Sequence, residues 1–259
     1  VEPSTSEWNS PLVLVRKKLV PGKEQTWRLC TDLRAVNTRI KTIHFPMPSF
    51  NDVTDAMLEK PVDWFSACDF RSGFHQIPLD EESRDITSFS FGAQKLRYRI
   101  LPFGLKSSSF VFQNIISDII GNRLLTSCAQ IYVDDLLIYS ATWLQHLKDL
   151  KNVFERLRAG GLLLHPEKSL FGLNKVRFLG HFISSDGVQV DNDKVEAIKK
   201  QPQPKNVSEL RSFIGMASFY RRFVKGFSQL LAPLRKLLCK EAKYVWTNDC
   251  ESAFQSLKK

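Results

Sequence analysis

The fold is decided by one stretch, Ile131-Tyr132-Val133-Asp134-Asp135-Leu136-Leu137-Ile138-Tyr139. Two apolar runs with β-branched and aromatic residues flank a pair of adjacent aspartates, which predicts a β-hairpin with both carboxylates at its tip. Runs of this kind can be buried on both faces, so we expect the hairpin to lie in a core with only its tip exposed.

The adjacent carboxylates of Asp134 and Asp135 indicate either a cation site or a simple turn. Two fixed carboxylates side by side repel each other unless a cation lies between them. Mg²⁺ suits such a pair, because it takes one or two protein carboxylates and leaves its other positions to water and phosphate. Asp is also a common turn residue, so the bare pair does not separate the two interpretations.

The composition is that of a globular chain. The 259 residues are 43% hydrophobic and 25% charged, which allows one large domain or two to three lobes. No run is long and apolar enough for a membrane helix, and the start has neither an initiator Met nor a signal peptide, which indicates part of a longer protein. Five scattered cysteines and five histidines show no zinc spacing, which predicts reduced thiols and no structural zinc.

Most of the positive charge lies at the C-terminal end. The chain has a formal charge of +10, and residues 192–259 carry +8 of it, whereas residues 61–191 are neutral. A basic lobe beside a neutral, carboxylate-bearing centre suggests a polyanion that one lobe holds and the other processes. A solvated basic surface explains the same distribution equally well.

Hydrophobic periodicity predicts a mixed α/β region followed by helices. A first hairpin is expected from 11–15 and a strand beginning at Trp27, with Arg16, Lys17 and Lys18 near its tip, where they suit a triphosphate or are ordinary surface charges. The helix at 142–158 should turn Leu147, Leu150, Phe154 and Leu157 inward, and Asn206 with Glu209 should form a capping box. Other strands are expected at 64–70, within 70–98 and at 176–182, and other helices at 49–60, 107–121, 206–225 and 228–240.

Six blocks in order resemble the reverse transcriptases of gypsy-type LTR retrotransposons and retroviruses. The blocks are Trp27-Arg28-Leu29-Cys30-Thr31-Asp32-Leu33-Arg34, Asp69-Phe70-Arg71-Ser72-Gly73-Phe74-His75-Gln76-Ile77, Leu101-Pro102-Phe103-Gly104-Leu105, Tyr132-Val133-Asp134-Asp135, Phe178-Leu179-Gly180-His181, and Leu210-Arg211-Ser212-Phe213-Ile214-Gly215 through Tyr220-Arg221-Arg222-Phe223. One block would be weak evidence, but six in order over nearly the whole chain are specific.

The resemblance implies an α/β (α+β) right-hand polymerase. Its fingers would be residues 1–44 and 77–107, its palm 45–76 and 108–185, its thumb 186–240, and 241–259 the start of a connection toward a missing ribonuclease H. The chain departs from the family at Ser107-Ser108-Ser109, which replaces a stretch that commonly carries Asn or Ala and then Pro, and at Phe74, where gypsy-type elements usually have Tyr.

The resemblance also implies roles for single residues. Asp69 would join Asp134 and Asp135 to hold two Mg²⁺ ions, with Mn²⁺ as an alternative, and Asp135 would contribute least. For Lys17 the neighbouring cations are alternatives, for Gln113 a helix-edge hydrogen bond, and for Phe74 a core position. The implied nucleotide contacts are Lys17, Arg28, Phe74 and Gln113; the primer contacts are Tyr132, Val133, Phe178, Leu179 and Gly180; the contacts to the nucleic-acid backbone are Arg211, Arg221, Arg222 and Lys225.

The function that follows is an RNA- and DNA-templated DNA polymerase that transfers nucleotides from dNTPs to a primer 3′-hydroxyl. Its partners would be a template with primer, dNTPs, the ribonuclease H, protease and integrase of the Pol polyprotein, and a second copy in a homodimer, with no membrane and a cytoplasmic, virus-like-particle setting. The alternative is a catalytically silent nucleic-acid-binding or structural subunit. An RNA-synthesising polymerase is disfavoured by Phe74, whose ring would exclude a ribose 2′-hydroxyl.

Overall fold

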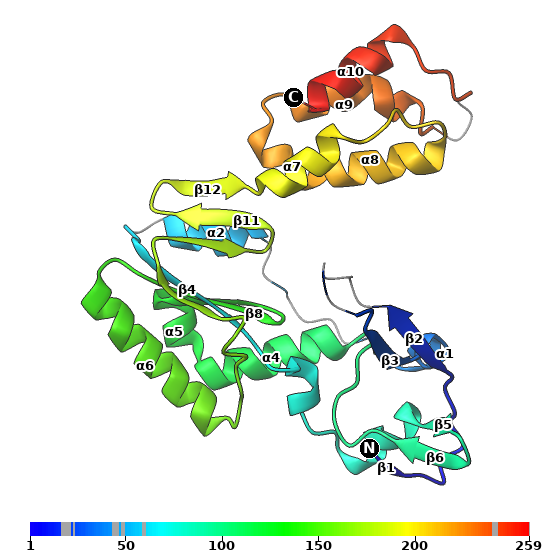
Figure 1. The fold of residues 1–259 in the computed structure, drawn as a ribbon, viewed down its shortest axis with the longest axis vertical. Coiled ribbons are helices and arrows are strands. Elements are labelled where there is room, and N and C mark those ends of the chain that lie inside the picture. The colour runs from blue at the N-terminus through cyan, green and yellow to red at the C-terminus, as the bar shows by residue number, and fades with distance from the viewer. Residues whose placement is uncertain are drawn as a thin grey trace. The chain divides into compact units, whose positions relative to one another are not determined.

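The computed structural model describes residues 1–16, 22, 24–42, 47, 50–58, 61–239 and 243–258. The chain divides into two compact units, which are described separately below (Figure 1). The first unit comprises Val1–Leu179 and Ser184–Asp186, and the second comprises Gly180–Ile183 and Gly187–Lys259.

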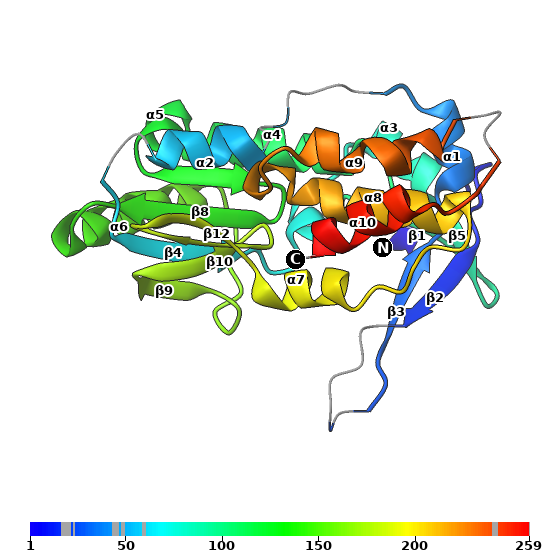
Figure 2. The ribbon, with the colours of Figure 1, turned by 90° about the horizontal axis from the view of Figure 1, so that it is seen from above.

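The first unit is built around a four-stranded antiparallel sheet with the strand order β7-β8-β4-β9 (Figure 2). Strands β7 and β8 are the two arms of the hairpin expected around the paired aspartates, and that prediction is confirmed. Leu136, Leu137 and Ile138 are each 0% exposed, so the hairpin does lie in a core. The strands are β4, Trp64–Asp69; β7, Ala129–Tyr132; β8, Asp135–Ser140; and β9, Leu170–Leu173.

Helices α4 and α6 pack on one face of this sheet. Phe112 and Ile116 of α4 and Val153 of α6 share a core cluster with Leu136 and Ile138 of β8. Residues two apart on a strand point to the same face, so this face carries both helices. The helices are α4, Ser108–Ile120; α5, Asn122–Ser127; and α6, Trp143–Ala159.

A buried chain of hydrogen bonds joins α6 to the sheet. His146 of α6 is 0% exposed and lies between two hydroxyl groups, with Nε2 2.7 Å from Ser66 Oγ and Nδ1 3.1 Å from Ser140 Oγ. Ser140 donates its own proton to Asp149 Oδ2 at 2.6 Å, so it accepts from the imidazole. The ring is therefore assigned as neutral with its proton on Nδ1.

The rest of the first unit is made of short elements. The first hairpin is confirmed, because β2 pairs with β3. Within 70–98, the strands expected on either side of Gly92 are confirmed as β5 and β6, whereas Gly73–Gln76 and Asp85–Thr87 form 3₁₀ turns with α3 between them. The elements are β1, Glu2–Pro3; β2, Leu12–Arg16; β3, Trp27–Thr31; α1, Arg34–Arg39; α2, Phe50–Leu58; α3, Glu81–Arg84; β5, Phe89–Phe91; β6, Gln94–Arg97; and β10, Lys175–Phe178.

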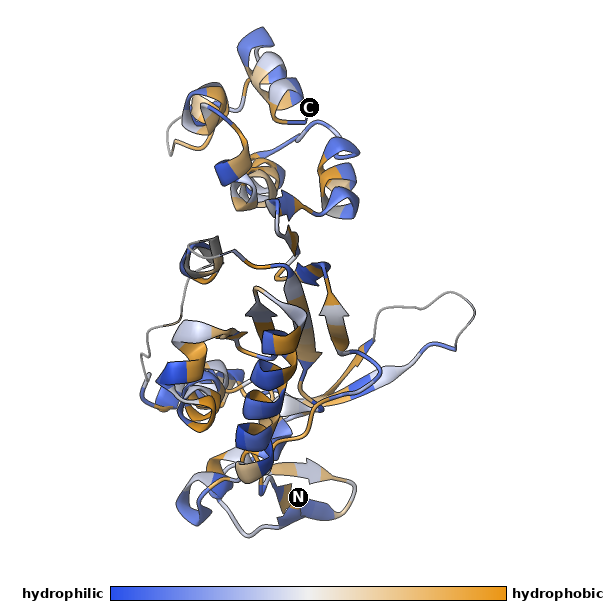
Figure 3. Cartoon of the chain, turned by 90° about the vertical axis from the view of Figure 1, so that its left-hand side faces the viewer, coloured by the Kyte–Doolittle hydropathy of each residue, from blue (hydrophilic) through white to orange (hydrophobic). Residues whose placement is uncertain are grey.

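Among its described residues, the second unit contains a hairpin and four α-helices. Each helix carries both hydrophobic and hydrophilic residues (Figure 3). The apolar faces pack together in a core that includes Leu210, Phe213, Leu231 and Phe254. The elements are β11, His181–Ser184; β12, Gly187–Val190; α7, Asn192–Lys199; α8, Val207–Phe219; α9, Phe227–Lys236; and α10, Asn248–Lys258.

The sequence-based expectations agree with the structure better for the helix ends than for the individual side chains expected to face the core. The Asn206 side chain accepts a hydrogen bond from the Glu209 amide at 2.9 Å, which confirms that cap. Ser107 occupies the N-cap of α4 without a side-chain cap bond. The expected inward position of Leu147 is wrong: its side chain is 45% exposed. The helix expected over 206–225 ends at Phe219, followed by a 3₁₀ turn.

The state of the cysteines agrees with the reduced thiols expected from the sequence. All five cysteines are free thiols, and Cys68, Cys128 and Cys250 are buried. Burial raises the pKa of the Cys68 thiol to about 12, so it is an inert core residue. Among the helices described, none has the length and apolar composition that crossing a bilayer requires.

Acidification is expected to destabilise the first unit through His146. Burial lowers the pKa of this imidazole, so the unfolded state takes up its proton at a higher pH than the folded state does. The stability that the neutral ring contributes is therefore complete above the unfolded pKa of about 6.5 and is lost as the pH falls from there toward the folded pKa. Urea unfolding on both sides of that value measures the loss.

The matched variant is His146→Gln, which keeps a polar side chain but does not titrate. It should cost about 1–3 kcal/mol at neutral pH, because it breaks buried hydrogen bonds. Its unfolding free energy should then fall less on acidification than that of the parent chain. Equal pH dependence in both proteins would assign the effect to other groups.

Candidate active site

The sheet brings together two carboxylates that are distant in sequence. In the antiparallel pair β4–β8, Asp69 lies directly opposite Asp135. Asp69 is the last residue of β4 and Asp135 the first of β8, so both lie at the same end of the sheet. Directly opposed residues in such a pair have Cβ atoms about 5 Å apart. The register therefore places the second carboxylate beside the first.

Asp134 reaches the same place through a strained turn. Val133 and Asp134 form the two-residue turn between Tyr132 and Asp135, which pair with each other. Val133 has φ +52°, a conformation that is rare for a β-branched residue. Such strain persists only where the surroundings fix it.

Gln113 supplies that constraint from α4. Its side-chain oxygen accepts the Val133 amide hydrogen at 2.7 Å, and its side-chain nitrogen donates to the Ile131 carbonyl at 3.2 Å. Gln113 is only 3% exposed. One buried amide thus satisfies a donor on one side of the turn and an acceptor on the other.

Asp134 lies in a tight and negatively charged setting. Its Oδ1 is buried and has no hydrogen-bond partner among the residues described. A Cβ on Gly73 would lie 2.9 Å from that oxygen and 2.8 Å from Phe112 Cζ, so a residue larger than glycine would displace one of them. Burial and the charge of Asp69 raise the pKa of Asp134, and the Lys168 ammonium partly offsets this.

Asp135 shares the electrostatic strain although its side chain reaches the surface. Partial desolvation of its carboxyl and the charges of Asp69 and Asp134 raise its pKa. Asp134 and Asp135, whose ionisation is opposed by burial and by neighbouring carboxylates, favour the approach of positive charge.

A cavity of about 400 Å³ joins these carboxylates to cationic and aromatic groups. Asp69 and Asp134 line it together with Arg28 of β3 and Lys168, whose ammonium lies 3.4 Å from Asp69 Oδ2. The Arg28 guanidinium carbon is 5.5 Å from the centre of the Phe103 ring, within range of a cation–π contact. The structure thus brings three of the residues singled out from sequence into one cavity.

Other residues of the cavity were not singled out individually from sequence. His75 packs against Phe103 with ring centres 4.8 Å apart, and burial, followed by the charge of Arg28, lowers its pKa. Tyr98 shares a hydrogen bond of 3.1 Å with Thr31. Phe103 and His75 fall within matched blocks, which could have signalled them. Lys168 carries no such signal, because only the fold brings its loop to Asp69.

Several predicted site residues lie outside the lining of this cavity. Phe74 is 8% exposed and packs against Phe103 and Phe112, with ring centres 5.2 and 5.3 Å apart. Gln113 lies beneath the hairpin, as an internal hydrogen-bond partner. The nucleotide roles of both stay predictions. Lys17 falls outside the described residues.

The predicted primer and backbone contacts are distributed over both units. Phe178 is buried at the end of β10, and Leu179 and Gly180 have φ of +48° and +76°. In the second unit, all four of the cations predicted to contact the backbone are exposed, and one of them, Arg222, also interacts within the protein. These four are Arg211, Arg221, Arg222 and Lys225.

Asp69 and Asp134 offer two carboxylates, which is the number of protein ligands that a divalent cation such as Mg²⁺ can use. The residues described hold no ready cluster of three His, Cys, Asp or Glu side chains around one point. Mg²⁺ needs only one or two carboxylates when phosphate oxygens complete its shell. The unpartnered Asp134 Oδ1, and the raised pKa values around it, match that requirement.

The fold and the carboxylate site define a right-hand polymerase. The chain is similar over 99% of its length to the foamy viral protease-reverse transcriptase solved with double-stranded DNA, with 27% identity and a TM-score of 0.81, covering 52% of that chain. It is similar over 99% of its length to the same enzyme solved with an RNA/DNA hybrid, with 27% identity and a TM-score of 0.80, covering 34% of that chain.

Sequence comparison identifies the family. Residues 15–183 match the family described as reverse transcriptase (RNA-dependent DNA polymerase), and the chain belongs to this family. It is 39% identical over 259 residues to the Pol polyprotein of transposon 412 and 36% identical over 243 residues to that of transposon gypsy, both from Drosophila melanogaster. These matches cover 100% and 92% of this chain but only 21% and 23% of the relatives, about a fifth of their length.

Gln113→Leu is expected to lower the unfolding free energy by about 2–4 kcal/mol. The substitution keeps a similar volume but leaves the Val133 amide and the Ile131 carbonyl without their partner in a buried setting. Val133 also loses the hydrogen bond that holds its positive φ. Denaturant unfolding of the variant and the parent chain measures the difference.

Gln130→Leu is the matched control on the same hairpin. Gln130 donates one hydrogen bond of 3.2 Å, to the Leu125 carbonyl in a partly buried setting. Its loss should cost about 1 kcal/mol. If both variants lost the same stability, Gln113 would be an ordinary core side chain without a special role at the turn.

Proposed function

We propose that this chain is the polymerase part of a Pol polyprotein and extends a primer 3′-hydroxyl with dNTPs on an RNA or DNA template. The observation that carries the proposal is the meeting of Asp69, Asp134 and Arg28 around one cavity of about 400 Å³. Carboxylates beside a guanidinium suit a nucleotide triphosphate that arrives with divalent cations. Membership of the reverse transcriptase family supports the same reaction.

We infer that Asp69 and Asp134 would hold two Mg²⁺ ions, with Asp135 in a supporting position and Mn²⁺ as an alternative. When bound, such ions lower the pKa of the primer hydroxyl and stabilise the charge that develops on the phosphates. The chain itself contributes the geometry. Gln113 holds the turn, and the β4–β8 register holds Asp69 against Asp135.

Arg28 would bind and orient the phosphates of the incoming nucleotide. Its guanidinium lies over Phe103 and offers donors that match phosphate oxygens. Lys168 is already paired with Asp69, so it would balance the carboxylate charge when no cation is bound. Phe74, which packs against Phe103, would act on the sugar, and Lys17, which lies outside the described residues, would also bind the phosphates.

The nucleic acid would be held by backbone close to the hairpin and by cations of the second unit. Tyr132 and Val133 directly precede Asp134 and would contact the primer end, as would Phe178, Leu179 and Gly180. Glycine allows a close approach of two backbones, and a Cβ on Gly180 would meet Phe219 only at 3.9 Å. Relatives solved with double-stranded DNA and with an RNA/DNA hybrid support this class of partner.

The remaining assignments extend the same proposal. Residues 1–44 and 77–107 would be fingers, 45–76 and 108–185 palm, 186–240 thumb, and 241–259 the start of a connection. We further infer ribonuclease H, protease and integrase as neighbours, a homodimer as a further partner, and a cytoplasmic virus-like particle as the setting. The relatives that are Pol polyproteins of transposons support the polyprotein context. No observation on the described residues favours a silent subunit.

Asp69→Asn and Asp134→Asn should each lower kcat for primer extension at least ~10³-fold, about 4 kcal/mol of activation free energy. Each change removes a negative charge that the cations need and keeps the side-chain volume. Primer extension by the chain on an RNA template, with Mg²⁺ and dNTPs, measures the rate. Asp118→Asn, on α4, is the control for loss of one carboxylate elsewhere. Near-normal extension by either of the first two variants would refute the assignment.

The triple variant Arg211→Ala, Arg221→Ala, Lys225→Ala should weaken template–primer binding and flatten its salt dependence. Each lost phosphate contact should reduce the slope of log K against log salt concentration by about 0.9. Arg222 is left intact because it interacts within the protein.

The matched control removes three cations from α6, with Lys148→Ala, Lys151→Ala and Arg158→Ala. Fluorescence anisotropy over a salt series gives both slopes. Equal slopes for the two triple variants would mean that the cations of the second unit are merely solvated.

A further inference from the structure

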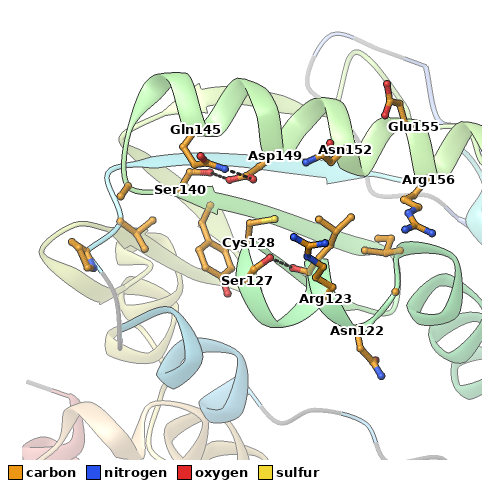
Figure 4. Close-up of a pocket in the computed structure, with 17 residues that line it drawn as sticks. Asn122, Arg123, Ser127, Cys128, Ser140, Gln145, Asp149, Asn152, Glu155 and Arg156 are labelled. Carbon is orange, nitrogen blue, oxygen red and sulfur yellow. Dashed lines mark hydrogen bonds between the residues drawn. The ribbon is translucent and has the colours of Figure 1, made fainter.

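A second, larger cavity lies in the first unit, away from the catalytic carboxylates (Figure 4). It has a volume of about 1020 Å³ and is lined by α5, α6, the segment Pro61–Val62 and the end of β8 at Ser140. Asp135 begins the same strand, and five residues of strand separate the two positions by roughly 17 Å. This cavity is therefore distinct from the one that Asp69 and Asp134 line.

Two guanidinium groups line this cavity without a partner. Arg123 comes from α5 and Arg156 from α6, and their side chains extend into the space between these two helices (Figure 4). Neither guanidinium makes an ion pair or hydrogen bond with any residue that the structure describes. Arginines on two separate elements, both facing one cavity, favour an anion that accepts hydrogen bonds from both.

The ring of Tyr139 belongs to the wall of the cavity. Tyr139 is 2% exposed, and its hydroxyl is closed to solvent and lies beside the Gln130 side chain. A ligand in the cavity would therefore contact the ring and not the hydroxyl.

The remaining walls define what else the ligand must offer. Val62, Ile120 and Leu124 supply apolar surface, which suits a carbon skeleton more than a bare ion. At the Ser140 end, Asp149 already accepts hydrogen bonds from Ser140 at 2.6 Å and Gln145 at 2.9 Å, drawn as dashed lines in Figure 4. Because its two oxygens are engaged, Asp149 is a fixed part of the wall, and it disfavours an anionic group at that end.

We propose that this cavity binds a small organic anion. Its carboxylate or phosphate lies between Arg123 and Arg156, and its carbon skeleton packs on the apolar wall. The volume is in the range of cavities that take drug-sized molecules. Carboxylate and phosphate share the chemistry that arginine recognises, so two probes separate them.

Isothermal titration calorimetry of the full chain with phenyl phosphate, benzoate and inorganic phosphate tests the proposal. We expect saturable binding of one equivalent of phenyl phosphate or benzoate, with inorganic phosphate at least tenfold weaker because it lacks the apolar part. The tighter of the two organic probes identifies the anionic group. No saturable binding of either organic probe below about 10 mM, or equal affinity for inorganic phosphate, would overturn the proposal.

Variants locate the binding. Arg123→Ala and Arg156→Ala should each weaken the organic probe about tenfold or more, whereas Tyr139→Phe, which removes a hydroxyl that the ligand does not reach, should bind like the parent chain. Arg158→Ala is the matched control, since Arg158 is an exposed arginine of α6 that does not line the cavity, and it should bind like the parent chain. Arg28→Ala excludes binding at the catalytic cavity. Unchanged affinity in both Arg123→Ala and Arg156→Ala, or a loss confined to Arg28→Ala, would refute the site.

Discussion

The position of Asp134 depends on one buried amide. Gln113 of α4 accepts from the Val133 amide and donates to the Ile131 carbonyl, so a single side chain spans the turn that carries the carboxylate. Val133 stays at φ +52° because this clamp and the adjoining strand pair determine it from both sides. Without the Gln113 side chain, the turn could relax toward conformations that a β-branched residue prefers, and Asp134 would move with the turn.

The same rigidity explains how carboxylates of like charge remain together. The β4–β8 register holds Asp69 opposite Asp135, and the Gly73 backbone leaves no room beside Asp134 Oδ1. Burial, together with repulsion that cannot separate the groups, therefore raises the pKa of Asp134 and Asp135. In the absence of a bound cation, Lys168 supplies the nearest compensation, through its ion pair with Asp69.

Sequence reasoning succeeded where the determinants are local. The hairpin at 131–139 follows from two apolar runs, and the cap of Asn206 on α8 follows from residue types at fixed spacing. It failed where tertiary packing decides. Leu147 fits the apolar stripe of α6 yet remains exposed. Lys168 and Gly73 acquire their place beside Asp69 and Asp134 only through long-range pairing, which no local pattern records.

The strand that carries Asp69 has a consequence for the chain as it is synthesised. Both sheet neighbours of β4, which are β8 and β9, come later in the sequence, the first beginning at Asp135 and the second at Leu170. While the ribosome makes the intervening residues, Trp64–Asp69 has both edges unpaired and presents an apolar strand to other nascent chains. Asp69 and Asp135 can come together only after β8 has emerged, so chaperones that cover exposed strands should matter most during that interval.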